Sequence, residues 1–133
     1  IRSGIYQNAF HMVGKEIQAI AVPGLAGAIE FGKSEEEMED IITQAFSPMP
    51  PADLVVLGCT HYPLVLPLFK KLMPTMQFFD PAVAVAERAK KLFWPQEVGN
   101  GTTTFLISED SLQFKGFVEK LFPGAKYKIE VLE

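Results

Sequence analysis

The spacing of apolar residues predicts helices and short strands in the first third of the chain. Residues 3–13 carry apolar side chains at roughly helical spacing, with Ser3 as the candidate N-cap. Residues 17–22 form a short β-prone run that predicts a buried strand, which Pro23 and Gly24 would end by opening a loop. Ser34, followed by three glutamates, has the form of a capping box and predicts a helix over residues 35–46.

The rest of the chain alternates between strand and helix patterns. Residues 53–57 predict a strand whose last four residues form an uninterrupted apolar run, typical of a parallel sheet that helices cover on both faces. A helix over residues 62–73 should tolerate Pro63 in its first turn and be perturbed by Pro67. Further elements are expected as strand, helix, strand, helix and strand at residues 77–79, 82–93, 102–107, 111–122 and 127–131, with a turn at 99–101 and Asp110 or Ser111 as the cap of the last helix. This order predicts an α/β protein with a mainly parallel sheet flanked by helices.

Composition narrows the class of protein. The 133 residues are 48% hydrophobic and 21% charged, as in a soluble globular domain, and we expect phenylalanines in the core, namely Phe31, Phe69, Phe78, Phe79 and Phe93. The net charge of −4, without a basic cluster, argues against a nucleic-acid partner. The apolar runs are too short to span a membrane and no signal pattern opens the chain, so a cytoplasmic location is expected. The start at Ile1 instead of Met indicates a processed, trimmed or fragmentary chain.

A single cysteine, Cys59, is the main candidate for chemistry. One cysteine forms no internal disulfide and supplies no four-thiolate zinc site, and neither common nucleotide-binding glycine motif is present. Cys59 follows the predicted strand 53–57, at the end where α/β sheets usually bind ligands. Gly58 would let a ligand approach the backbone, and amides near Thr60 at a helix N-terminus would attract a carboxylate and lower the thiol pKa. His61 could tune or relay the proton of that thiol.

Each of these residues also has an ordinary structural explanation. A lone cysteine after an apolar strand is commonly a small buried hydrophobic residue. His61 could be a helix-terminal histidine bonded to the backbone, and Thr60 could cap the helix. Glu30, after a glycine-containing stretch, could be a solvated loop acid, and His11 a surface or packing residue. Local chemistry alone leaves both interpretations open.

Residues 57–64, Leu-Gly-Cys-Thr-His-Tyr-Pro-Leu, closely resemble the second cysteine motif of bacterial glutamate racemases. The histidine at position 61 is specific, because aspartate racemases usually have an acid there. Residues 2–6 resemble the helix start after the Thr-rich loop of that family, residues 79–82 the segment before its next helix, and residues 105–122 its closing strand and helix. The resemblance therefore extends through nearly the whole chain.

The resemblance implies a flavodoxin-like, doubly wound racemase domain and a two-base reaction on glutamate without cofactor or metal. One cysteine removes the α-proton and a second, on the opposite face, returns one, which would supply D-glutamate for peptidoglycan and so for the cell wall and cell shape. By this resemblance Cys59 is one of the two bases, His61 assists it, Thr60 and Gly58 lie at the substrate, and Glu30 matches an acid near the site.

The chain departs from that family in having one cysteine where two are needed. The resemblance implies that residues 1–80 form the C-terminal-half α/β domain without its first strand, and that residues 81–133 form a tail that packs on a missing N-terminal half. We therefore expect an inactive half-site, with a homodimer also allowed. Two alternatives are a non-catalytic binding domain of the same fold, which the residues before Ile1 would distinguish, and a Cys-His hydrolase, for which Cys-x-His alone lacks the required geometry.

Overall fold

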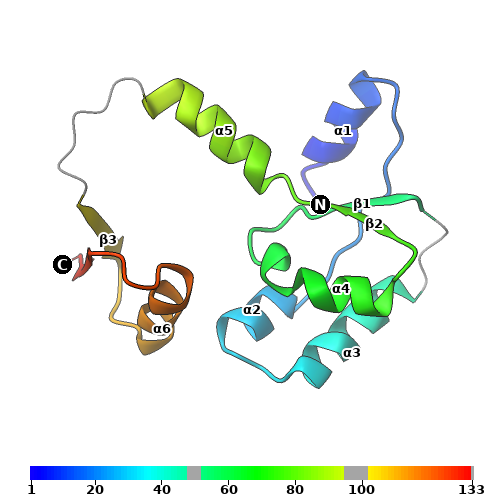
Figure 1. The fold of residues 1–133 in the computed structure, drawn as a ribbon. Helices are drawn as coiled ribbons and strands as arrows, with labels where there is room; N and C mark the ends of the chain where they lie inside the picture. The colour runs from blue at the N-terminus through cyan, green and yellow to red at the C-terminus, as the bar shows by residue number, and fades with distance from the viewer. Residues whose placement is uncertain (48–51, 95–101, 133) are drawn as a thin grey trace. The chain divides into compact units, whose positions relative to one another are not determined.

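The computed structural model describes residues 1–47, 52–94 and 102–132 (Figure 1). The chain divides into two compact units, Ile1–Asp80 and Pro81–Glu133, and each unit is described by itself. The predicted turn at 99–101 and the prolines Pro48, Pro50 and Pro51 lie outside the described residues.

The first unit contains helices followed by one strand–helix–strand segment. Its elements are α1 (Ile5–Met12), α2 (Leu25–Glu30), α3 (Glu35–Phe46), β1 (Leu54–Val56), the 3-10 helix η1 (Tyr62–Val65), α4 (Leu66–Leu72) and β2 (Gln77–Phe79). Strands β1 and β2 are parallel, with Val55 opposite Phe78. Helix α3 packs against both α2 and α4, and α2 packs against η1, which carries part of the cysteine motif.

The second unit repeats the same kind of connection. It contains α5 (Ala82–Phe93), β3 (Thr103–Ile107), α6 (Leu112–Leu121) and β4 (Tyr127–Val131). Strands β3 and β4 are parallel, with Phe105 opposite Ile129, and α6 lies between them in sequence. The Ser111 hydroxyl accepts a hydrogen bond from the Phe114 amide, so Ser111 is the cap of α6. The predicted α/β class with parallel strands and intervening helices is confirmed in both units.

The core of the first unit is built around the ring of Phe69. Phe69 is fully buried and lies 5.7–6.0 Å, between ring centroids, from Phe46, Tyr62 and Phe78. Fully or nearly buried aliphatic side chains complete this core, namely Val22, Leu25, Ile29, Ile42, Leu57 and Leu68. The second unit has a similar centre in Phe105, which contacts the rings of Phe114, Phe122 and Tyr127.

Three of the five phenylalanines predicted to be core residues are exposed. Phe31 is 65%, Phe79 48% and Phe93 63% accessible, whereas Phe69 is buried and Phe78 half-buried. Phe79 is exposed because successive strand residues point to opposite faces, and the face that carries Leu54, Val56 and Phe79 is uncovered within the first unit. Within the described residues of the first unit, the helix cover expected on both faces of strand 53–57 is thus absent from the face that carries Leu54 and Val56.

The segment before α3 differs from the prediction in three places. Residues 17–22 form no strand, because no described strand lies beside them to complete a ladder. Helix α1 is capped by Gly4, with φ 64°, and not by Ser3. The predicted loop after Pro23 is instead the helix α2, which Gly24 opens with φ 83°, a conformation that favours glycine. Glu30 therefore ends a helix and is not a loop residue.

The predicted helix over residues 62–73 is divided into two. Residues Tyr62–Val65 form η1, and α4 begins at Leu66 with Pro67 in its first turn. Proline lacks the N–H that a continuous α-helix needs at that position, whereas a first turn leaves this donor unused. Pro67 therefore perturbs the predicted helix as expected, because a new helix begins one residue before it.

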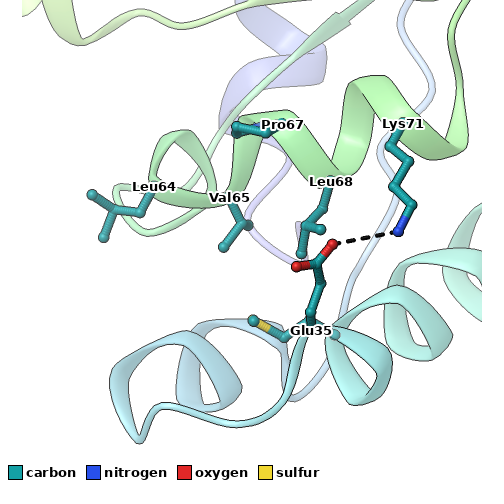
Figure 2. Close-up of a pocket in the computed structure, with 7 residues that line it drawn as sticks. Glu35, Leu64, Val65, Pro67, Leu68 and Lys71 are labelled. Atoms are coloured by element: carbon teal, nitrogen blue, oxygen red, sulfur yellow. Dashed lines mark hydrogen bonds and ion pairs between the residues drawn. The ribbon is translucent and has the colours of Figure 1, made fainter.

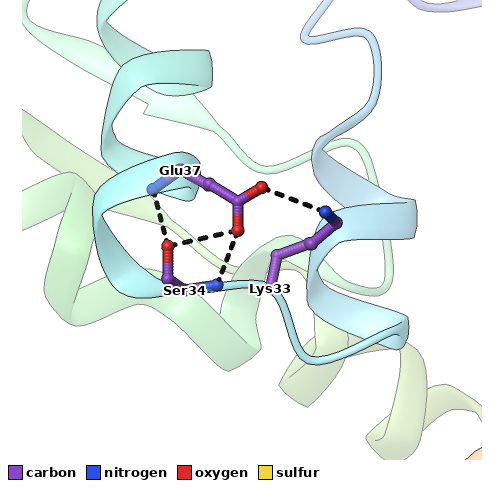
Figure 3. A network of polar contacts seen from close by, with 3 residues as sticks. All are labelled: Lys33, Ser34 and Glu37. Atoms are coloured by element: carbon purple, nitrogen blue, oxygen red, sulfur yellow. Dashed lines mark hydrogen bonds and ion pairs between the residues drawn. The ribbon is translucent and has the colours of Figure 1, made fainter.

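The capping box that opens α3 is formed as predicted (Figure 3). The Ser34 hydroxyl accepts from the Glu37 amide at 3.2 Å, and the Glu37 carboxylate accepts from the Ser34 amide at 3.1 Å and from the Lys33 ammonium at 3.0 Å. The bond from Lys33 and then that from the Ser34 amide hold the pKa of Glu37 below its ordinary 4.5. Because the folded-state pKa is lowered, this stabilisation is present above pH 4.5 and is lost as the pH falls through the lower folded value.

Replacing the capping hydroxyl should weaken the first unit measurably. Ser34→Ala is expected to lower the free energy of unfolding at pH 7 by about 1 kcal/mol, because one helix-terminal N–H loses its acceptor. Urea denaturation followed by circular dichroism measures this change. Ser3→Ala is the matched control: α1 has no side-chain cap, so its midpoint should stay at that of the native chain. Equal losses in both variants would contradict the assignment.

Candidate active site

The cysteine motif lies in a tight turn immediately after β1. The Leu57 amide donates to the Phe79 carbonyl at 2.9 Å, which extends the pairing of β1 with β2 by one bond. The Cys59 carbonyl then accepts from the Tyr62 amide at 3.3 Å and the His61 carbonyl from the Leu64 amide at 3.0 Å. The turn therefore stands past the carboxyl end of a parallel strand, where α/β proteins usually bind ligands.

The side chains of Cys59, His61 and Glu30 meet at this turn. The Cys59 thiol is half-buried and lies 4.0 Å from Nδ1 of His61. On the other side of the imidazole, Nε2 of His61 lies 3.8 Å from a carboxylate oxygen of Glu30. The His61 ring thus stands between a thiol and an acid, although Glu30 is 29 positions away from Cys59 in the sequence.

This order of groups suits proton transfer. If Nε2 carries the proton, on the side of the ring that faces Glu30, Nδ1 has a lone pair within reach of the thiol and of the Thr60 hydroxyl. Nδ1 can then accept the thiol proton, and the carboxylate of Glu30 stabilises the resulting imidazolium. The thiolate, which is the basic form of cysteine, would be stabilised in turn by the adjacent positive charge.

Gly58 and Thr60 are the residues immediately before and after Cys59. The Thr60 hydroxyl lies 3.4 Å from Nδ1 of His61, and η1 has no side-chain cap, so Thr60 is not a helix cap. A Cβ placed on Gly58 would meet no atom within 4 Å, and Gly58 has no positive φ. Neither packing nor backbone strain explains glycine at this position, whereas close approach of a ligand would.

The structural alternatives for the other site residues fit less well. The ring of His61 contacts side chains, and Cys59 is not a core residue. His11 lies at the surface and pairs with Glu16 at 2.9 Å. A helix dipole, however, contributes less than predicted at Cys59, because the helix that follows the turn is a four-residue 3-10 helix. The neighbour of the thiol is therefore a histidine and not a long helix terminus.

Tyr62 is the site residue that sequence reasoning missed. Its hydroxyl donates to the Val22 carbonyl at 3.2 Å, and its ring packs on Phe69. Burial, and then the negative charge of the Cys59 thiolate, raise the pKa of Tyr62 above its ordinary 10. The phenol therefore stays protonated at neutral pH and remains a donor. Tyr62 lies within the motif at residues 57–64, but the sequence pattern predicts only a helix start for it.

A groove on the first unit lies apart from this site. It has a volume of about 310 Å³ and lies between α3 and the η1–α4 segment (Figure 2). Lys71 pairs there with Glu35 of α3, as Figure 2 shows. It also pairs with Glu39 of the same helix. Its lining residues are Glu35, Met38, Leu64, Val65, Pro67, Leu68 and Lys71. None of these is a predicted site residue, so the groove is not the position of the thiol chemistry.

No group of three or more His, Cys, Asp or Glu side chains in residues 1–47, 52–94 and 102–132 is arranged to hold a metal ion. None of the helices in these ranges is long and apolar enough to cross a bilayer.

Comparison with known proteins identifies the relatives of this fold and motif. No family model matches the chain. A glutamate racemase of Carboxydothermus hydrogenoformans is 34% identical over 123 residues, which cover 86% of this chain and 46% of the relative. One of Roseobacter denitrificans is 32% identical over 108 residues, which cover 77% of this chain and 40% of the relative. The chain thus spans less than half of the length of these curated relatives.

Solved structures agree on the fold. A glutamate racemase isoform of Bacillus anthracis superimposes with a TM-score of 0.80 at 21% identity, covering 99% of this chain and 53% of the other. A glutamate racemase of Francisella tularensis, solved in complex with D-glutamate, gives 0.84 at 19% identity and the same coverage.

The solved structures thus agree with this chain in their α/β fold. In sequence, the chain is similar to glutamate racemases over most of its length, as residues 57–64 predicted.

Proposed function

We propose that this chain is the C-terminal portion of a glutamate racemase and contributes one of two catalytic thiols. The observation that carries the proposal is the position of the His61 imidazole between the Cys59 thiol, at 4.0 Å, and the Glu30 carboxylate, at 3.8 Å. Sequence similarity to glutamate racemases over most of the chain supports glutamate as the substrate. The parent protein would be an isomerase that needs neither cofactor nor metal.

In the proposed reaction Cys59 works as a thiolate for one enantiomer and as a thiol for the other. As a thiolate it takes the α-proton of glutamate, while a second thiol protonates the opposite face of the carbanion; in the reverse direction Cys59 donates its proton. His61 holds or releases the proton that sets the charge of Cys59, and Glu30 stabilises the imidazolium. Thr60 and the open space at Gly58 would receive the substrate carboxylate.

The second thiol must come from another part of the protein, because the sequence contains one cysteine. We propose that it lies in an N-terminal half on the same polypeptide, on which residues 81–133 would pack. The share of the relatives that this chain matches, 46% and 40%, supports a division into two such halves. The product D-glutamate would serve peptidoglycan synthesis, which implies a cytoplasmic enzyme.

Isotope exchange tests the half-site directly. The 133-residue chain is incubated with L-glutamate in deuterium oxide, and the α-position is followed by proton NMR and chiral chromatography. No D-glutamate should form, because one thiol cannot protonate the face opposite to the one it deprotonates. The complete protein should form D-glutamate with one solvent deuteron at Cα.

Two results would contradict the proposal. Inversion by the chain alone would show that one thiol suffices. Binding of glutamate by the complete protein without inversion would instead identify a non-catalytic binding domain of the same fold. A Cys59→Ala chain, handled in parallel, is the control for contaminating racemase.

A further inference from the structure

Two segments far apart in sequence form the candidate site. The distance in space between them must stay constant if Glu30 is to interact with His61. The turn at residues 58–61 carries the thiol and the imidazole, whereas Glu30 stands at the end of α2. The Nε2 to carboxylate distance of 3.8 Å is longer than a normal hydrogen bond. Both Glu30, 55% exposed, and His61, 33% exposed, keep access to solvent, so their mutual attraction alone is weak.

Tyr62 connects the same two segments through a second, less exposed contact. Its backbone amide closes the turn on the Cys59 carbonyl, and its hydroxyl donates to the carbonyl of Val22. Val22 is 7% exposed and precedes Gly24, the residue that caps α2. The hydroxyl therefore fixes the start of the helix whose last residue is Glu30.

These contacts link the turn and α2 at both ends of the helix. Cys59 faces His61, and His61 faces Glu30 at the end of α2. At the other end of α2, Tyr62 joins the turn to Val22, two residues before the helix cap. Leu25 and Ile29 of α2 are buried, so a displacement of this short helix would have to carry both side chains with it. Loosening the Val22 end of α2 would therefore change the distance at the Glu30 end.

We infer that Tyr62 is a positioning residue that holds Glu30 against His61 and thereby sets the protonation of the Cys59–His61 pair. The inference rests on the proposed function, because the protonation of Cys59 matters for catalysis only in that reaction. Its physical content is independent of catalysis: Tyr62 acts on the thiol through Glu30. Among the described residues, the titratable side chains in contact with His61 are Cys59, from the turn, and Glu30, from α2, and the phenol of Tyr62 interacts with the charge of Cys59.

The rate at which iodoacetamide alkylates the single cysteine, measured over a range of pH, tests this coupling in the full chain without substrate. The midpoint of the rate curve marks the pH at which the thiol becomes the reactive thiolate. Glu30→Gln should move this midpoint upward, because the imidazolium loses its negative neighbour, and the change should be modest since both groups are partly exposed. Tyr62→Phe, which keeps the ring on Phe69, should move it in the same direction.

The double variant Tyr62→Phe/Glu30→Gln decides the route. If Tyr62 acts through Glu30, the double variant shifts the midpoint no further than Glu30→Gln alone. Tyr6→Phe, at an exposed position in α1, is the matched control and should leave the curve unchanged. An unmoved midpoint in Tyr62→Phe, a uniform rise of the rate at every pH, or a double shift equal to the sum of the two single shifts would each overturn the inference. Because no glutamate is present, failure here leaves the racemase proposal standing, and inactivity of the complete protein leaves this coupling measurable.

Discussion

In the complete racemase, Cys59→Ser should lower kcat by about 10²–10⁴-fold while KM changes little. A serine hydroxyl keeps the size and polarity of the thiol but is far too weak an acid to form its anion near neutral pH, even with His61 4.0 Å away. Proton abstraction or delivery on one face of the substrate would therefore stop. Steady-state rates in both directions, from L- and from D-glutamate, measure the loss.

His61→Gln should lower the rate less than Cys59→Ser does. It removes the group that exchanges a proton with Cys59 but leaves the thiol, so its rate loss should be smaller than that of Cys59→Ser and should shrink as the pH rises and the thiol ionises unaided. A Cys59→Ser enzyme that kept more than a tenth of the native kcat would exclude Cys59 as one of the two bases.

Phe69→Ala is expected to cost about 3–5 kcal/mol in the free energy of unfolding, the largest effect on stability in the first unit. The Phe69 ring is fully buried and contacts three other aromatic rings from α3, η1 and β2. Removing it leaves a cavity that those rings cannot fill without losing contacts with one another. Because Tyr62 is one of them, the turn that carries Cys59 should loosen as well. Urea denaturation followed by circular dichroism measures the change.

Phe79→Ala removes the same side chain from an adjacent part of the fold. Phe79 is 48% exposed on the uncovered face of β2, so less apolar area leaves water on folding and the loss should be smaller, about 1–2 kcal/mol. Equal losses at the two positions would show that the ring cluster around Phe69 is not the centre of the core.

Local patterns were sufficient where one segment decides its own structure. Ser34 with Glu37 defines a helix start within four residues, and α3 begins and ends where the pattern predicted. The alternation of Tyr127, Ile129 and Val131 likewise predicted β4. Such features depend on contacts between near neighbours, which the sequence shows directly.

The errors arose where a segment depends on partners elsewhere. Residues 17–22 have the composition of a strand, but a strand exists only beside another strand, and no described strand lies there. Phe31 and Phe79 are as hydrophobic as Phe69, yet only the tertiary fold decides which ring meets other rings. The sequence pattern identifies a hydrophobic side chain, whereas the packing of the whole fold decides whether that side chain is buried.

The candidate site divides in the same way. The sequence by itself determined the motif at residues 57–64, its place after a parallel strand, and the presence of a single thiol, because these are matters of residue order. Only the tertiary structure decided that Glu30 ends a helix whose carboxylate reaches His61, and that Tyr62 holds the start of that helix at Val22. Both contacts join residues about 30 to 40 positions apart, so the packing of α2 against η1, and not any local pattern, brings them together.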